Sequence, residues 1–434
     1  ITMNKQLIWC LFICFSFVDY TKAQVNTDAL MKSILAKLEN EGTRKVIDNP
    51  NAFRVQIIYT QIDRSKKGEP VFKNYHFNVD PDLYFNPASM VKMPLAFLSL
   101  EKLRELNIAG VDKDTRMEFD SSYERQVAMK NDSSAQNGYP SIAQFIKRSF
   151  LISENDPYNR MYQFMGQQAI NKKLVEKGYT SSRITRQFMG YTEEQNRHTN
   201  GIRFLNADGK EVYYQSPQYN RDSFNFPAPI LIGEAHINRE DQLIKAPFDF
   251  TKHNNISLED MRKMIQAVVF PASVEKKNRF NVSEEDRLFL LRFMSQYPSE
   301  TNYPKYDTSI FYDSYVKFFF DDSTHTIAPH IRVFNKVGWA YGFMTDVSYI
   351  LDTKNNIDYM LSATIYVNSD GVVNDSKYDE EAVGFPFFKH IGKLFYEYEL
   401  NRPRKYKPQL YNQVKQYEKR DPNDRRPSIK QADN

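Results

Sequence analysis

The chain has 434 residues, of which 41% are hydrophobic and 26% are charged, a composition typical of a globular protein with a large core. The formal net charge of +4 is small for this length. No basic stripe interleaved with aromatic residues precedes the C-terminal tail, so nucleic acid is not expected as a partner. Aromatic residues make up 14% of the chain and are expected to pack in the core and on a sheet.

The N-terminal segment has the order of a secretory signal peptide. Met3 and Lys5 form a positive start, an apolar stretch runs over 7–18, and Ala23 is a small residue suited to precede cleavage. We therefore expect a signal peptide over 1–23 and an exported protein, periplasmic or extracellular. An uncleaved anchor is the alternative. Both cysteines, Cys10 and Cys14, lie in this segment, so the mature protein would have neither a disulfide nor a cysteine nucleophile.

Hydrophobic periodicity predicts the elements that follow. Helices are expected over 28–40, 89–106, 141–153, 157–165, 256–269, 283–295 and 387–400. Strands are expected over 53–62, 71–79, 331–339, 345–352 and 357–367, with a hairpin of 202–205 and 211–214 around Asn206-Ala207-Asp208-Gly209.

This order predicts a mixed α/β (α+β) fold. Strands from both ends of the chain would form one antiparallel five-stranded sheet, flanked by helices and with a helical lobe inserted between the strands. One domain is expected over 24–400, with a proline-containing insertion at about 201–250. The tail over 401–434 is basic and lacks an apolar face, so it is predicted to be disordered.

Ser89-Met90-Val91-Lys92 is a Ser-x-x-Lys sequence. On a helix, positions i and i+3 lie on one face, so the hydroxyl can meet the amine, and a neutral lysine can take the serine proton. Three further copies begin at Ser99, Ser273 and Ser314. The Ser89 copy differs from them because it opens the apolar helix after the first two strands, where free backbone N–H groups can hold an oxyanion.

Two later sequences can supply polar groups to the same cleft. Ser153-Glu154-Asn155 lies between two predicted helices, and Lys336-Val337-Gly338 interrupts an otherwise apolar strand. Gly338 would allow a substrate backbone to approach closely. Each sequence has a plainer interpretation, since an edge-strand lysine also discourages aggregation.

Together the three sequences resemble those of the serine β-lactamase and penicillin-binding superfamily, most of all class A β-lactamases. That family has a Ser-x-x-Lys, then a Ser-Asp-Asn, then a Lys-Thr-Gly on a strand that lines the cleft. The resemblance covers about 53–400 and implies the β-lactamase/transpeptidase fold and an acyl-enzyme mechanism without a cofactor.

The resemblance also implies roles for the residues. Ser89 would be the nucleophile and Lys92 its base, while Ser153 would pass a proton to the leaving nitrogen. Asn155 would hold a substrate amide, and Lys336 would attract a carboxylate and keep Lys92 neutral. Since a lysine pKa is ordinarily ~10.4, Lys92 needs burial or a nearby cation. The backbone N–H groups of Ser89 and Trp339 would form the oxyanion hole.

Some positions depart from the family pattern. Glu154 replaces an Asp, and Val337 replaces a Thr or Ser whose hydroxyl helps to hold a carboxylate. The family uses a loop glutamate, with an Asn four residues later, to activate the deacylating water. Here Glu193 is the candidate base, although Asn196 follows it by only three residues.

These departures leave the function open between three alternatives. The first is a serine hydrolase acting on a β-lactam, peptide or other amide bond, with a small-molecule or peptidoglycan-type substrate. The second is a D-Ala-D-Ala carboxypeptidase-like enzyme, and the third a binding protein with this fold and a degraded site. The histidines show no ligand spacing, so no metal is expected. The sequence does not indicate an oligomeric state.

Overall fold

The computed structural model describes residues 27–408 and 417–432. The segment expected to be a signal peptide, with both cysteines, lies outside these residues. The described helices are α1 Ala29–Leu35, α2 Glu41–Asp48, α3 Lys92–Leu106, α4 Ile142–Leu151, α5 Asn155–Met165, α6 Gln167–Glu176, α7 Glu193–Asn196, α8 Leu258–Val269, α9 Glu284–Ser295 and α10 Phe385–Asn401. The strands are β1 Gln56–Arg64, β2 Pro70–Phe77, β3 Arg116–Phe119, β4 Ile202–Leu205, β5 Glu211–Gln215, β6 Leu231–Ile232, β7 Ala235–Ile237, β8 Leu243–Ile244, β9 Phe248–Asp249, β10 Ile331–Ala340, β11 Phe343–Asp352, β12 Ile357–Tyr366 and β13 Val372–Val373.

The main sheet has five strands in the order β10-β11-β12-β1-β2, and all four pairings are antiparallel. Both ends of the chain therefore contribute to one sheet, as the sequence predicts. Strand β10 is an edge strand, and it packs against a 3-10 turn, Ala88–Val91, that precedes α3. This contact brings the strand with Lys336 to the turn with Ser89.

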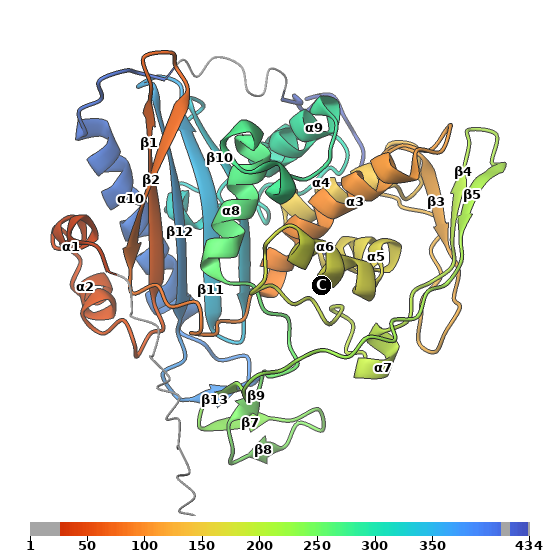
Figure 1. The fold of residues 1–434 in the computed structure, drawn as a ribbon, viewed down its shortest axis with the longest axis horizontal. Helices are drawn as coiled ribbons and strands as arrows, with labels where there is room; N and C mark the ends of the chain where they lie inside the picture. Colours follow the sequence, from red (N-terminus) through yellow and green to blue (C-terminus); the bar gives the residue numbers. More distant parts are fainter. Residues whose placement is uncertain (1–26, 409–416, 433–434) are drawn as a thin grey trace, which may run out of the picture.

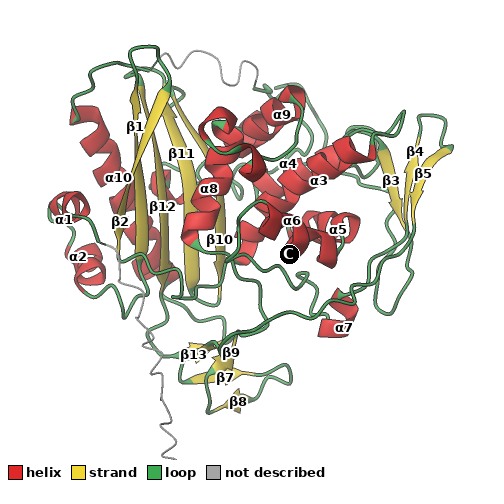
Figure 2. Cartoon of the chain, viewed as in Figure 1, coloured by secondary structure: helices red, strands yellow, loops and turns green. Residues whose placement is uncertain are grey.

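Helices cover both faces of the sheet (Figures 1 and 2). Helices α1, α2 and α10 lie on one side, and the lobe that contains α3, α5 and α8 lies on the other. Each side has its own cluster of buried apolar residues. The lobe-side cluster is the larger one and includes α3 residues such as Leu95 and Leu98, both fully buried. Burial of this size is the main favourable contribution to folding.

The predicted helix over 28–40 is instead two helices. Helix α1 ends at Leu35, and α2 begins at Glu41. The Asn40 side chain accepts a hydrogen bond from the Thr43 N–H, as an N-cap residue does. The prediction was wrong at this point because Asn40 starts a second helix rather than ending the first. Residues Leu38 and Val46 remain buried on the inner face of the pair.

Residues 201–250 lie apart from the main sheet. Strands β4 and β5 form the predicted hairpin and pair with β3. Strands β7 and β8 form a second hairpin, which pairs with β13 through β7. Figure 1 shows β7, β8, β9 and β13 beyond one end of the main sheet, and β3, β4 and β5 on the far side of the helical lobe. The second hairpin forms part of the cavity wall described below.

The tail differs from its predicted disorder over 417–432. Arg420 donates hydrogen bonds to the carbonyl oxygens of Thr301 and Tyr306, and Ile429 forms a bridge with Tyr306. Composition misses this arrangement because the tail anchors itself by single side chains rather than by an apolar face. Of the described helices, none has the length and apolar character needed to cross a membrane.

Candidate active site

Ser89 lies in a cavity of about 870 Å³ where the sheet edge, the helical lobe and the second hairpin meet. The turn before α3 supplies Ser89, the segment between α4 and α5 supplies Ser153, and Asn155 is the first residue of α5. Strand β10 supplies Trp339. A cavity of this size accommodates a small molecule or a short peptide.

The Ser89 and Lys92 side chains are in direct contact. Lys92 Nζ lies 2.7 Å from Ser89 Oγ, and the lysine side chain is fully buried. Ser89 itself belongs to the 3-10 turn, and α3 begins at Lys92. The i to i+3 spacing therefore joins the two groups across this turn, as the sequence predicts for one helical face.

Three further groups surround the same lysine. Lys92 Nζ donates to Asn155 Oδ1 at 2.8 Å and to the Ser153 carbonyl oxygen, and Ser153 Oγ is 3.3 Å away. Lys336 Nζ donates to Ser153 Oγ at 2.7 Å. Ser153 has a positive φ of 66°, an uncommon conformation for a residue with a side chain. The result is a continuous polar chain from Ser89 through Lys92 and Ser153 to Lys336.

Burial lowers the pKa of both lysines. Burial, and then the positive charge of Lys336, hold the pKa of Lys92 well below its usual value, while Glu154 opposes this shift. Burial also lowers the pKa of Lys336, with a smaller effect from the charge of Lys317. A lowered pKa makes it easier for a lysine to lose its proton and then to accept one from a serine.

Strand β10 alternates between the two faces of the sheet, and this alternation corrects two expectations. Val337 is buried in the cluster on the α10 side, so its side chain does not lie where a carboxylate-binding hydroxyl was expected. Gly338 faces the turn before α3, where a Cβ atom would lie 2.4 Å from the Pro87 carbonyl oxygen and 3.0 Å from the Met90 nitrogen. Gly338 thus admits the backbone beside Ser89 rather than a substrate.

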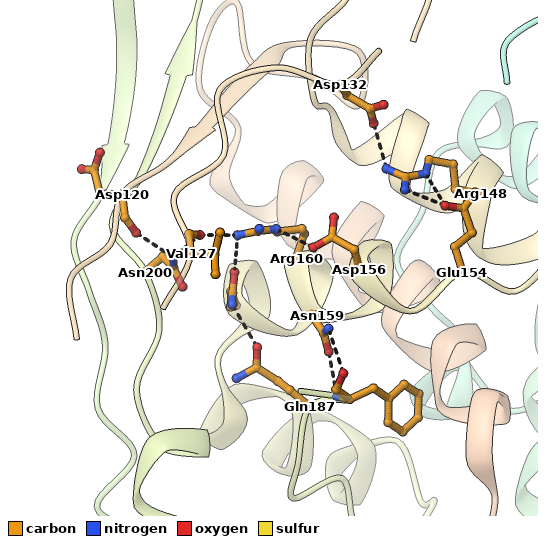
Figure 3. A network of polar contacts seen from close by, with 12 residues as sticks. Asp120, Val127, Asp132, Arg148, Glu154, Asp156, Asn159, Arg160, Gln187 and Asn200 are labelled. Atoms are coloured by element: carbon orange, nitrogen blue, oxygen red, sulfur yellow. Dashed lines mark hydrogen bonds and ion pairs between the residues drawn. The ribbon is translucent and has the colours of Figure 1, made fainter. Parts of the chain in front are cut away.

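Glu154 does not line the cavity, and Figure 3 shows it beside Arg148. Arg148 donates to Glu154 Oε2 at 2.6 Å and to Asp132 at 3.1 Å, and Tyr306 donates to Glu154 Oε1. All four side chains are buried. Glu154, the middle residue of Ser153-Glu154-Asn155, therefore holds the backbone next to Ser153 through its contacts with Arg148 and Tyr306. The sequence pattern did not predict this role.

The structure does not bring Glu193 to this site. Glu193 begins α7, and its side chain is 66% exposed and forms an ion pair with Lys252 at 2.7 Å. The residue lines a separate cavity. Asn196, the residue whose spacing suggested this base, accepts a hydrogen bond from the Gln187 N–H. It holds the loop rather than a water molecule beside Ser89.

Phe188 occupies the position next to the lysine. Lys92 Nζ lies 5.5 Å from the centre of the Phe188 ring, and Asn159 Oδ1 accepts a hydrogen bond from the Phe188 N–H (Figure 3). Among the described residues that line the Ser89 cavity, Glu240 is the one carboxylate, at the exposed tip of the second hairpin. The sequence pattern of a carboxylate base does not indicate that a phenylalanine lies beside Lys92.

The other Ser-x-x-Lys copies do not form a serine–lysine hydrogen bond. Lys102 donates to Gln215, the Ser273 hydroxyl to the Phe270 carbonyl oxygen at 2.7 Å, and the Ser314 hydroxyl to Asp321 at 2.6 Å. The described part of the chain contains no group of three or more metal-ligating side chains. This architecture, with a Ser–Lys–Ser–Lys chain at the sheet edge, is the fold of the β-lactamase class of serine hydrolases.

The chain belongs to the Beta-lactamase enzyme family, whose profile matches residues 43–398. Membership in this family indicates a hydrolase that acts on amide bonds of small-molecule substrates. No curated protein matches the sequence. Solved structures with similarity include the β-lactamase of Sphaerobacter thermophilus DSM 20745, 14% identical, covering 84% of this chain and 98% of that one with a TM-score of 0.44. The class A β-lactamase reconstructed for the last common ancestor of Gram-negative bacteria is 12% identical, with coverages of 82% and 100% and a TM-score of 0.43.

Proposed function

We propose that this protein is a serine amide hydrolase that is acylated at Ser89 and releases the acyl group slowly. The observation that carries the proposal is the 2.7 Å contact between Lys92 Nζ and Ser89 Oγ, made by a buried lysine with a lowered pKa. A positioned base beside a hydroxyl is the arrangement that activates a serine nucleophile. A binding protein with a degraded site has no need to keep a buried lysine in this form.

The chain of contacts supports a complete acylation step. Ser89 Oγ attacks the amide carbonyl carbon as its proton passes to Lys92 Nζ. When the C–N bond breaks, Ser153 gives its hydroxyl proton to the leaving nitrogen and receives the proton held by Lys92. The products are an ester at Ser89 and a free amine, and Lys92 is neutral again. The backbone N–H groups of Ser89 and Trp339 are proposed to hold the oxyanion, since both residues line the cavity.

Deacylation is proposed to be the slow half of the reaction. It needs a base to activate water, and the described carboxylate that lines the cavity, Glu240, is at an exposed hairpin tip. Phe188 lies beside Lys92, where it offers no proton acceptor. The proposed substrates are a β-lactam or a peptidoglycan-type peptide. The proposed location, periplasmic or extracellular, rests on the sequence of residues 1–23.

The experiment is intact-mass spectrometry after incubation with benzylpenicillin. The wild-type protein should gain one penicillin, and Ser89→Ala should gain none. Steady-state hydrolysis of a chromogenic cephalosporin should be slow, with the acyl-enzyme accumulating. Absence of any adduct on the wild-type protein, or an adduct that persists on Ser89→Ala, would overturn the proposal.

A further inference from the structure

One part of the cavity wall is formed by the loop over 186–190 and the tip of the β7–β8 hairpin. Two arginines, Arg186 and Arg239, stand on this wall, together with His253. The same three residues also line the neighbouring cavity of about 590 Å³. They therefore lie along the boundary between the two cavities.

Neither arginine has a carboxylate partner among the residues that the structure describes. Arg186 Nη1 donates instead to His253 Nε2 at 2.7 Å. Because an arginine has no acceptor, this ring nitrogen must be the unprotonated one. Burial, and then the charge of Arg186, lower the pKa of His253 to about 3, so the ring is neutral at physiological pH. The histidine orients the guanidinium without cancelling its charge.

The backbone of Arg186 is held as firmly as its side chain. Its carbonyl oxygen accepts from Tyr158 Oη at 2.7 Å and from Asn254 Nδ2 at 3.2 Å, and its N–H donates to Asn254 Oδ1 at 3.0 Å. One of the five N–H groups of the guanidinium is used by His253, so the others remain for a ligand. A positioned arginine of this kind suits a planar anion such as a carboxylate.

We infer that Arg186 and Arg239 form an anion-binding wall that selects substrates with a carboxylate on the acyl side. This inference rests on the proposed function. Lys336 contacts Ser153, the proposed proton donor to the leaving nitrogen, so a carboxylate near Lys336 belongs to the leaving side. Arg186 lies in the loop that carries Phe188, the ring beside Lys92, and is not one of the groups that bond the Ser153 hydroxyl. A substrate group bound at Arg186 therefore belongs to the acyl part of the substrate, on the other side of its carbonyl carbon from the leaving nitrogen.

The residues that line the two cavities supply the charges that face this region. Asp249 and Arg197 line the neighbouring cavity, where Arg197 donates to the carbonyl oxygens of Asn220 and Asp222. Glu240 adjoins Arg239 at the exposed hairpin tip, His236 lies on β7, and His253 is neutral. In the neighbouring cavity, Lys252 is paired with Glu193 at 2.7 Å. Arg186 and Arg239 are therefore the arginines that line the Ser89 cavity itself and can meet an anion bound there.

Two penicillins that differ by one group test the inference. Carbenicillin is benzylpenicillin with an additional carboxylate on the acyl side chain. The ratio of their second-order acylation rate constants, carbenicillin over benzylpenicillin, should exceed one for the wild-type protein. It should fall about tenfold in Arg186→Gln, the loss expected for a charge-assisted hydrogen bond. Arg239→Gln, at an exposed position, should lower the ratio as well without any risk to folding.

Arg183→Gln is the matched control. Arg183 lies in the same segment but bonds the carbonyl oxygens of Asn225 and Thr251 and does not line the cavity, so the ratio should stay at its wild-type value. A ratio that is unchanged in both Arg186→Gln and Arg239→Gln would overturn the inference.

A binding measurement separates this inference from the proposed function. Phenylmalonic acid monoamide and phenylacetamide are the two acyl fragments without the β-lactam. Saturation-transfer NMR on Ser89→Ala should show tighter binding of the charged fragment, lost in the Ser89→Ala, Arg186→Gln double variant. Failure of both penicillins to acylate the wild-type protein would overturn the proposed function, whereas equal binding of the two fragments would overturn the anion-binding wall.

Discussion

Lys336 Nζ lies 2.7 Å from Ser153 Oγ although the two residues are 183 positions apart in the chain. Lys92 Nζ is 3.3 Å from the same hydroxyl, so Ser153 lies between two buried lysines. A hydroxyl can accept a proton from one group while it donates its own to another. This geometry makes Ser153 suited to pass a proton, and it makes each lysine sensitive to the charge of the other.

The first prediction concerns the nucleophile. A fluorophosphonate probe should label the wild-type protein at Ser89, and Ser89→Ala should abolish the label because Lys92 then has no hydroxyl to activate. Peptide mapping by mass spectrometry identifies the labelled residue. Ser273→Ala is the matched control, since Ser273 also begins a Ser-x-x-Lys copy but bonds a backbone carbonyl. Labelling of Ser89→Ala at the wild-type level would contradict the assignment.

The second prediction separates the two lysines by pH. Acylation requires neutral Lys92, so its rate should rise with pH through the lowered Lys92 pKa. Lys336→Gln removes a positive charge that lowers this pKa. The Lys92 pKa should then rise, and the acid limb of the rate profile should shift to higher pH. Stopped-flow acylation between pH 5 and about 10, near the ordinary lysine pKa, measures the shift.

Lys336→Arg keeps the charge and should leave the limb closer to its wild-type position. Lys92→Ala should lower acylation about a thousandfold on the alkaline side of the profile, where wild-type Lys92 is neutral, within the usual range for loss of a general base. An identical pH profile for the wild-type protein and Lys336→Gln would show that the two lysines are not coupled.

The third prediction adds the carboxylate that the site lacks. Phe188→Glu places a proton acceptor near Lys92, so the acyl-enzyme should be hydrolysed faster, by about tenfold or more given the usual contribution of a general base. Glu193→Gln should leave deacylation unchanged, because Glu193 is exposed and paired with Lys252. The decay of the penicillin adduct, followed by intact mass, measures both. Two results would count against this description of deacylation. One is loss of the adduct from Phe188→Glu no faster than from the wild-type protein, and the other is slower loss from Glu193→Gln.

The fourth prediction concerns the support behind Ser153. Glu154→Gln leaves the buried Arg148 without one of its charge partners, which should lower the free energy of unfolding by about 3 kcal/mol. Acylation should slow as well, because Glu154 holds the backbone next to Ser153 and a shift of that backbone would displace the Ser153 hydroxyl. Glu285→Gln is the control, because the Glu285 side chain is 82% exposed in its ion pair with Lys113. Its stability should change by less than about 0.5 kcal/mol.

Denaturant unfolding followed by fluorescence gives both free energies. Equal stability of Glu154→Gln and Glu285→Gln would mean that the buried ion pair does not fix this segment.

The sequence by itself predicted the features that depend on local pattern. Alternating apolar residues identified the strands of the main sheet, and the position of Ser89 at the start of an apolar helix separated it from the three other Ser-x-x-Lys copies. Such features are recoverable because side-chain periodicity reports directly which face of an element is buried. The five-stranded antiparallel sheet followed from the order of these elements.

The tertiary structure alone decided which polar groups meet. Spacing along the chain suggested Glu193 as a base, but the loop instead places Phe188 beside Lys92 and turns Glu193 to the surface. The alternation of side chains along β10 buries Val337 on the α10 side of the sheet. A side chain at position 338 would collide with the Pro87 carbonyl oxygen, which explains why this residue is a glycine. The pKa of Lys92 likewise depends on burial and on Lys336, which only folding brings close. These properties arise from distances between segments far apart in sequence, and no local pattern encodes those distances.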